Sequence, residues 1–176
     1  MKNLSYYDCL QIEDQGYELI RPYLKKNFDE FVYVQGKRRA DFLKAFQINY
    51  GDLIAKKNNE LVFIDLKTET QNKYGNFFLE TWSNKARGKP GWFMPEGGVR
   101  ADYLYYIFLD QKNSFYIIDL PKARTWAFAD NRLHNYPEKR QNKYDQLNDT
   151  WGRCVKINDA IASGIAAEII FLPDNL

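Results

Sequence analysis

The sequence of 176 residues predicts an α/β protein built as one domain, residues 1–176. Two observations favour this class. An amphipathic helical pattern opens the chain, and two later segments join strand-forming stretches by short polar turns, as β-hairpins do. Hydrophobic residues make up 45% of the chain and aromatic residues 16%, which suffices for one well-packed core at this length.

The first predicted element is a helix over residues 4–26. Its apolar residues recur at helical spacing: Tyr6, Leu10, Tyr17, Ile20 and Leu24. Ser5 is a candidate N-cap, and Lys25 and Lys26 suit the negative end of the helix dipole. The pattern therefore predicts a helix with one face against the protein interior.

A short strand is predicted at residues 31–34, and residues 36–46 are compatible with either a loop or a short helical turn. The next segment reads as a β-hairpin. Its strands are residues 52–55 and 61–69, and its turn is residues 56–60.

Residues 76–82 predict a third strand. Residues 84–100 are rich in glycine, proline and basic side chains, which is typical of a long functional loop. A second hairpin follows, with strands at residues 101–110 and 115–120, and a helix begins at Pro121, where proline suits the first helical turn.

The C-terminal part is less regular. Residues 130–150 are polar, and the chain closes with a mixed segment from Val155 and an apolar run at residues 165–173. No apolar run approaches the ~18 residues of a membrane span, and the opening residues lack the pattern of a signal peptide. We therefore expect a soluble, unprocessed protein in the cytoplasm.

Charge and reactive residues exclude several classes. With 25 Lys and Arg against 23 Asp and Glu, the formal charge is +2, so a nucleic acid would have to be held by a local basic patch. Cys9 and Cys154 are too few and too far apart for a disulfide framework or a zinc site. The single histidine, His134, lies in a polar stretch, where we expect a surface side chain rather than part of a Ser-His or Cys-His pair.

The first hairpin carries an unusual set of charges. Because side chains alternate along a strand, Asp65 and Lys67 share one face while the apolar residues Val62, Ile64 and Leu66 share the other. Asp52 opens the antiparallel neighbour and can lie beside them. Two carboxylates so placed suit a divalent cation, and an all-oxygen site suits magnesium better than zinc.

A surface hairpin with a cross-strand salt bridge, worth at most ~1 kcal/mol, is the alternative interpretation. Asp-x-Lys alone carries little information, because residues 110–112 match it too, within a polar turn.

An acid, a hairpin and then Asp-x-Lys after an N-terminal helix resembles the PD-(D/E)XK nuclease superfamily. The stretches "YGNFFLETWSN", "GKPGWF" and "ADYLYYIF", in this order, look like a small phage and bacterial branch, over roughly residues 10–120. The resemblance implies a restriction-endonuclease-like fold, with a mixed central β-sheet flanked by helices. Tyr50-Gly51 departs from the usual lead-in to the first acid, and Asp65 stands where glutamate is commoner, an accepted variant.

By resemblance, Asp52, Asp65 and the backbone carbonyl of Leu66 bind Mg²⁺, for which Mn²⁺ can substitute, and Lys67 orients or helps to deprotonate the attacking water. The implied reaction is in-line hydrolysis of a DNA phosphodiester, leaving a 5′-phosphate and a 3′-hydroxyl. The chemistry of metal ions agrees, since they lower the pKa of bound water and stabilise charge on a phosphoryl oxygen.

Two glutamates are further candidates. The resemblance implies a helix acid near the metal, and Glu18 matches it by distance along the chain. Helical geometry favours Glu13, because at 100° per residue Glu13 lies on the apolar stripe and Glu18 almost opposite. We rank Glu18 slightly higher on resemblance. Glu80 matches a recurrent acid of the third strand, as a further ligand, a supporting residue or a partner of Lys67.

Basic and aromatic residues next to each other suit phosphates and splayed bases. Two segments have this character, and their candidate residues are Lys85, Arg87, Lys89, Trp92 and Phe93 in one, and Lys37, Arg38 and Arg39 in the other. For Trp92 the alternative is packing back onto the domain.

Two other functions stay open. One is a catalytically inactive nuclease-fold protein that binds nucleic acid or a protein partner, and the other is a small interaction module with solvated hairpin charges. A homodimer would suit the cutting of two strands, although no segment identifies an interface.

Overall fold

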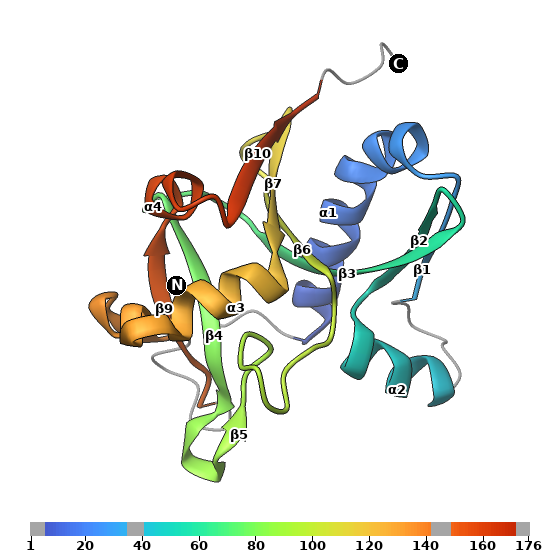
Figure 1. The fold of residues 1–176 in the computed structure, drawn as a ribbon. Coiled ribbons are helices and arrows are strands. Elements are labelled where there is room, and N and C mark those ends of the chain that lie inside the picture. Colours follow the sequence, from blue (N-terminus) through green and yellow to red (C-terminus); the bar gives the residue numbers. More distant parts are fainter. Residues whose placement is uncertain (1–5, 35–40, 142–148, 172–176) are drawn as a thin grey trace.

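The computed structural model describes residues 6–34, 41–141 and 149–171. Its main sheet has six strands, in the order β1 (Glu30–Tyr33), β2 (Leu53–Lys57), β3 (Glu60–Glu69), β6 (Tyr103–Phe108), β7 (Ser114–Asp119) and β10 (Ala166–Ile170). Strands β3 and β6 are parallel, and the other neighbours are antiparallel (Figure 1). This mixed sheet with flanking helices confirms the predicted α/β class.

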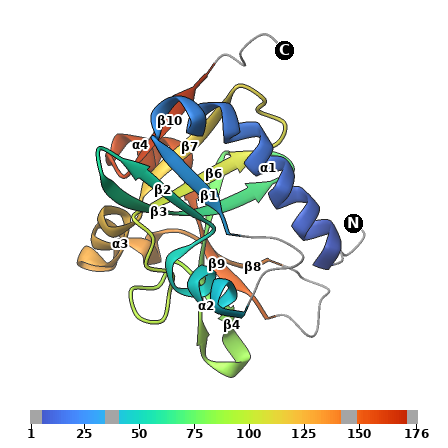
Figure 2. The same ribbon diagram turned by 90° about the vertical axis from the view of Figure 1, so that its right-hand side faces the viewer.

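A second sheet has four strands, in the order β5 (Lys89–Pro90), β4 (Asn76–Asn84), β9 (Trp151–Lys156) and β8 (Glu138–Arg140). Figure 2 shows it below the main sheet. The strand predicted at residues 76–82 is therefore real, but its neighbours are β5 and β9 and it does not join the hairpin that precedes it.

Helices cover the sheets. They are α1 (Tyr6–Asn27), α2 (Asp41–Tyr50), α3 (Leu120–Phe128) and α4 (Ile157–Ala162), with short 3-10 turns at Lys85–Arg87 and Ala129–Asn135. Ser5, the predicted cap of α1, lies outside the described residues. Residues 36–46, for which the sequence allowed either a loop or a short helical turn, contain the start of α2. Phe46 and Tyr50 of this helix contact Phe63 of β3. Packing against the sheet, rather than local sequence, stabilises this short helix.

The main sheet separates two apolar cores. On one face, Ile20 and Leu24 of α1 pack with Ile64 and Leu66 of β3. On the other face, residues from β4, β9, α3 and α4 pack against β6 and β7. Tyr106 of β6 lies fully buried in this second core.

The Tyr106 hydroxyl links the two sheets. It donates a hydrogen bond to Glu69 of β3 and accepts one from the Phe78 N–H of β4, at 3.1 Å. This linkage fixes β4, and the residues it carries, relative to β3.

Gly16→Ala is expected to destabilise the protein, although the same change in an exposed helix is normally favourable by about 1 kcal/mol. A Cβ at Gly16 would lie 2.8 Å from Thr68 Cγ2 and closer still to Thr68 Oγ1, because α1 crosses β3 there. We expect a loss of about 1–3 kcal/mol in the free energy of unfolding, as for other overpacked sites.

The measurement is thermal unfolding of a double-mutant cycle with Thr68→Ala, which removes the two closest atoms. Gly16→Ala should cost much less in the Thr68→Ala background. An equal cost in both backgrounds would show that the close approach of α1 to β3 is not its cause.

Among the described residues, none of the helices combines the length and the apolar character needed to cross a membrane.

Candidate active site

The first hairpin has the predicted alternation. Its turn is Asn58-Asn59, both with positive φ, which gives a two-residue connection of the kind favoured between twisted strands. Ile64 and Leu66 are buried against α1, whereas Asp65 and Lys67 lie on the opposite face and are partly exposed. The charged face of β3 is therefore turned toward the second sheet.

Asp52 lies immediately before β2 and is only 5% exposed. Its N–H donates to the Ile64 carbonyl at 3.0 Å, which holds its backbone against β3. One carboxylate oxygen accepts from the Leu66 N–H at 2.9 Å, and the other accepts from the Gln47 side chain of α2. These contacts hold the carboxylate in one position; Gln47 was not foreseen from the sequence.

Gly51 allows the backbone before β2 to lie close to β3. It has φ +102°, and a Cβ there would lie 2.7 Å from the Ile64 carbonyl oxygen and 3.0 Å from Asp65 Cα. Only glycine adopts such a conformation readily at so short a distance. Gly51, which departs from the lead-in expected by resemblance, therefore has a structural role at the site.

The two aspartates meet. Burial raises the pKa of Asp65 well above its ordinary value, and the Asp52 charge, a side-chain hydrogen bond with Asp52 and the Glu13 charge raise it further, while Lys67 opposes them. A hydrogen bond between two carboxyl groups requires a proton on one of them. Without a cation, the pair therefore holds a proton up to a higher pH than isolated aspartates do.

The helix acid is placed differently from the prediction based on resemblance. Glu18 is exposed and pairs with Arg21 at 3.2 Å, so the structure does not bring it to the aspartates. Glu13 is the helix glutamate whose charge acts on Asp65. The reason is helical geometry: Gly16 and Ile20 pack on the sheet, and Glu13 lies on their side of α1.

The charge of Lys67 acts on groups of other elements. Burial raises the pKa of Glu80 on β4, while the Lys67 charge and a hydrogen bond from the Trp92 N–H oppose that rise. The same lysine also acts on the Cys9 thiol of α1, whose pKa burial and Glu13 raise. Glu80 and Asp65 thus approach the Lys67 ammonium from different strands.

The loop after β5 is fastened beside Glu80. The Gly91 N–H donates to the Thr81 carbonyl at 2.9 Å, and the Phe93 N–H donates to the Glu80 carbonyl at 3.1 Å. Phe93 is fully buried, and Trp92 is partly buried against the same core. The "GKPGWF" segment is therefore held in place by backbone hydrogen bonds and apolar packing. This agrees with the alternative interpretation of Trp92, in which it packs back onto the domain.

Arg124 of α3 binds the backbone of this segment and of the loop that follows it. Its guanidinium donates to the carbonyls of Trp92 at 2.6 Å, Phe93 at 3.0 Å and Val99 at 2.7 Å. Burial lowers its pKa, and the charge of Asp65 opposes that effect. No sequence pattern pointed to Arg124, because its partners are backbone carbonyls distant in the chain.

A cleft of about 360 Å³ opens at these residues. Its described lining consists of Gln47, Ile48, Asp52, Asp65, Glu80, Ser83, Trp92, Gly97 and Val99. Four of the predicted site residues, namely Asp52, Asp65, Glu80 and Trp92, thus share one cleft.

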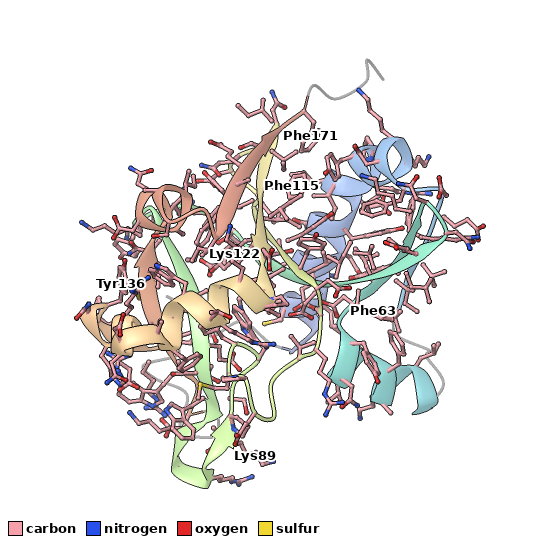
Figure 3. The ribbon with its side chains drawn as sticks, viewed as in Figure 1. Phe63, Lys89, Phe115, Lys122, Tyr136 and Phe171 are labelled. Atoms are coloured by element: carbon pink, nitrogen blue, oxygen red, sulfur yellow. The ribbon has the colours of Figure 1, made fainter. Side chains whose placement is uncertain are left out.

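The predicted phosphate-binding residues are more dispersed. Lys85 pairs with Glu138 at 2.7 Å and lies over the Trp151 ring at 4.5 Å, so its ammonium already has partners. Arg87 and Lys89 are exposed, and Figure 3 shows Lys89 at the end of the molecule formed by β4 and β5. The predicted residues Lys37, Arg38 and Arg39 lie outside the described part of the chain.

The second Asp-x-Lys copy has a different role. Both carboxylate oxygens of Asp110 lie 3.1 Å from the Asn72 N–H, and Lys112 is exposed in the β6–β7 turn. This copy fixes a turn, which agrees with the reading of the sequence.

Magnesium fits the donor set at Asp52 and Asp65. In residues 6–34, 41–141 and 149–171 no three His, Cys, Asp or Glu side chains form a metal-binding group, but Mg²⁺ commonly uses one or two carboxylates and keeps several waters. In a strand, the N–H and C=O of one residue point to the same side. Because the Leu66 N–H reaches Asp52, its carbonyl points to that side too.

No family model, curated protein or solved structure matches this chain. Its function is therefore inferred from the geometry of the cleft.

Proposed function

We propose that this protein is a metal-dependent nuclease that hydrolyses phosphodiester bonds of DNA. The observation that carries the proposal is the Asp52–Asp65 carboxyl pair, held together in a cleft that also contains Glu80 and lies near Lys67. Carboxylates forced together by the backbone are costly unless a proton or a cation compensates them. A magnesium site explains why the fold keeps them there.

A magnesium ion, with manganese as a substitute, would neutralise both carboxylates and polarise the scissile phosphate. Gln47 and the Leu66 N–H keep the Asp52 carboxylate oriented. Lys67 orients the attacking water and stabilises negative charge on the phosphoryl oxygens. Glu80 keeps the Lys67 ammonium beside the cleft by charge attraction.

The reaction is a displacement at phosphorus. The oxygen of one water forms a bond to phosphorus in line with the leaving 3′-oxygen, whose bond to phosphorus breaks. The water, oriented by the Lys67 ammonium, gives up a proton to solvent, and the 3′-oxygen takes up a proton from solvent. The products are a 5′-phosphate and a 3′-hydroxyl, and one water is consumed.

Lys67→Ala is expected to reduce cleavage of DNA in Mg²⁺ or Mn²⁺ by about 10²-fold or more, the size expected for a residue that assists proton transfer. EDTA should abolish cleavage by the wild type. The matched control is Lys112→Ala, which removes the lysine of the second Asp-x-Lys copy, exposed in a turn. The measurement is the initial rate of cleavage of single-stranded and of duplex DNA, with DNA binding and melting temperature recorded for each variant.

Binding should persist in Lys67→Ala, and Lys112→Ala should cut like the wild type. If Lys67→Ala cuts as fast as the wild type at matched metal and salt, the assignment of the site is wrong. DNA that is bound but uncut in both metals would favour the alternative, a nuclease-fold protein that binds without cutting.

A further inference from the structure

The cleft differs in composition from a surface that grips a double helix. Asp52, Asp65 and Glu80 are part of its lining, and no lysine or arginine is among its described lining residues. Duplex DNA presents a continuous surface of phosphates, and proteins bind it mainly by neutralising them with lysine and arginine. Apart from the scissile phosphate at the magnesium site, the part of the substrate that fills this cleft is therefore not mainly phosphate.

Part of the cleft lining is apolar. Helix α2 contributes Ile48, and the loop after β5 contributes Trp92 and Val99. Ile48 is 66% exposed, while Phe46 and Tyr50 of the same helix hold α2 against the sheet. A single exposed isoleucine needs no explanation. Because Ile48 lines the same cleft as Trp92 and Val99, these three residues give the cleft an apolar part, called the slot below.

Basic side chains lie outside the slot. Lys44 is exposed one helical turn before Ile48, and Arg100 is exposed where its N–H donates to the Asn49 carbonyl at 2.6 Å. Arg100 and Lys44 therefore flank the end of α2 that lines the cleft. This arrangement suits phosphates beside the cleft and a base within it.

We infer that the cleft takes one unpaired nucleotide, with its base against Ile48 and Trp92, so that the substrate is single-stranded DNA or the unpaired part of a flap or frayed end. The volume of about 360 Å³ is at the small end of clefts that enclose one small ligand. A base within an intact duplex is already stacked and paired, and extracting it has an energetic cost. This inference rests on the proposed function and specifies its substrate class.

The test compares a fluorescein-labelled oligothymidine with the same strand in a blunt duplex, by anisotropy in Mg²⁺ in the Lys67→Ala background. The single strand should bind at least about tenfold more tightly than the duplex, as expected from a base–aromatic stacking contact. Ile48→Ala should weaken single-strand binding about tenfold, because it removes apolar surface that the base covers. Leu61→Ala is the matched control, because Leu61 is 61% exposed on β3 and does not line the cleft.

Equal affinity for both probes, or equal effects of Ile48→Ala and Leu61→Ala, would overturn the inference. Cleavage by the wild type separates the two proposals. Duplex cut as fast as single strand contradicts the substrate class and leaves the nuclease function standing. If neither is cut, while single-strand binding still depends on Ile48, the nuclease function fails and the slot for an unpaired nucleotide stands.

Discussion

Asp65→Asn is expected to abolish metal-dependent cleavage and at the same time to raise the melting temperature of the metal-free protein. Cleavage should fall by at least about 10³-fold, because the variant loses a charge that stabilises the transition state through the metal. Stability should rise by about 1 kcal/mol, since active sites commonly keep strained groups at the expense of stability. The amide group introduced by this substitution can donate to the Asp52 carboxylate without requiring a shared proton.

The pH dependence follows from the raised pKa of Asp65. The folded state holds the proton more tightly than the unfolded state, so the stabilisation is fully present below the ordinary aspartate pKa of about 3.9 and is lost as the pH rises through the raised value. Asp52 and Glu13 raise that value and Lys67 lowers it. The advantage of Asp65→Asn over the wild type should therefore grow with pH.

Thermal unfolding in EDTA, at about pH 5 and about pH 8, measures this effect, and 1 kcal/mol corresponds to about 2–4 °C at this chain length. Added Mg²⁺ should raise the melting temperature of the wild type and not that of Asp65→Asn. Glu60→Gln is the control, because it removes an exposed carboxylate from the far end of the same strand. If Asp65→Asn melts at or below the temperature of the wild type at about pH 8, the Asp52–Asp65 pair does not destabilise the metal-free protein, and the prediction is wrong.

Local patterns predicted the part of the site that lies on one hairpin. Alternation along β3 was enough to place Asp65 and Lys67 on one face, and the turn of Asn58-Asn59 brings Asp52 level with them. The same spacing logic favoured Glu13 over Glu18, and the structure agrees with the helical geometry rather than with the ranking based on resemblance.

The remaining contacts depend on packing between distant segments. Strand β4 pairs with β9, some 70 residues later, so nothing local to Glu80 indicates its neighbours. Gln47 contacts the Asp52 side chain, and Arg124 contacts three backbone carbonyls. Such contacts leave no periodic pattern in the sequence. Alternation predicts which way a side chain points from its own strand, but not what it meets there.

Gly51→Ala is expected to lower the free energy of unfolding by about 3 kcal/mol, or about 6–12 °C in melting temperature, and to reduce cleavage with it. Two costs add at this position. An alanine at φ +102° is strained, and its Cβ would lie 2.7 Å from the Ile64 carbonyl oxygen. That oxygen accepts from the Asp52 N–H, so relief of the clash requires β3 to move away from Asp52.

Gly88→Ala separates the two costs. Gly88 also has positive φ, +60°, but a Cβ there would meet no atom within 4 Å, so only the backbone penalty of about 1 kcal/mol should appear. Thermal unfolding and cleavage rates of the two variants measure the difference, which reports the close packing of Gly51 on β3. Because this packing sets the separation of Asp52 from Asp65, Gly51→Ala should lose activity even well below its melting temperature, whereas Gly88→Ala should keep it. Equal losses of stability in the two variants would mean that the site does not depend on the close approach at Gly51.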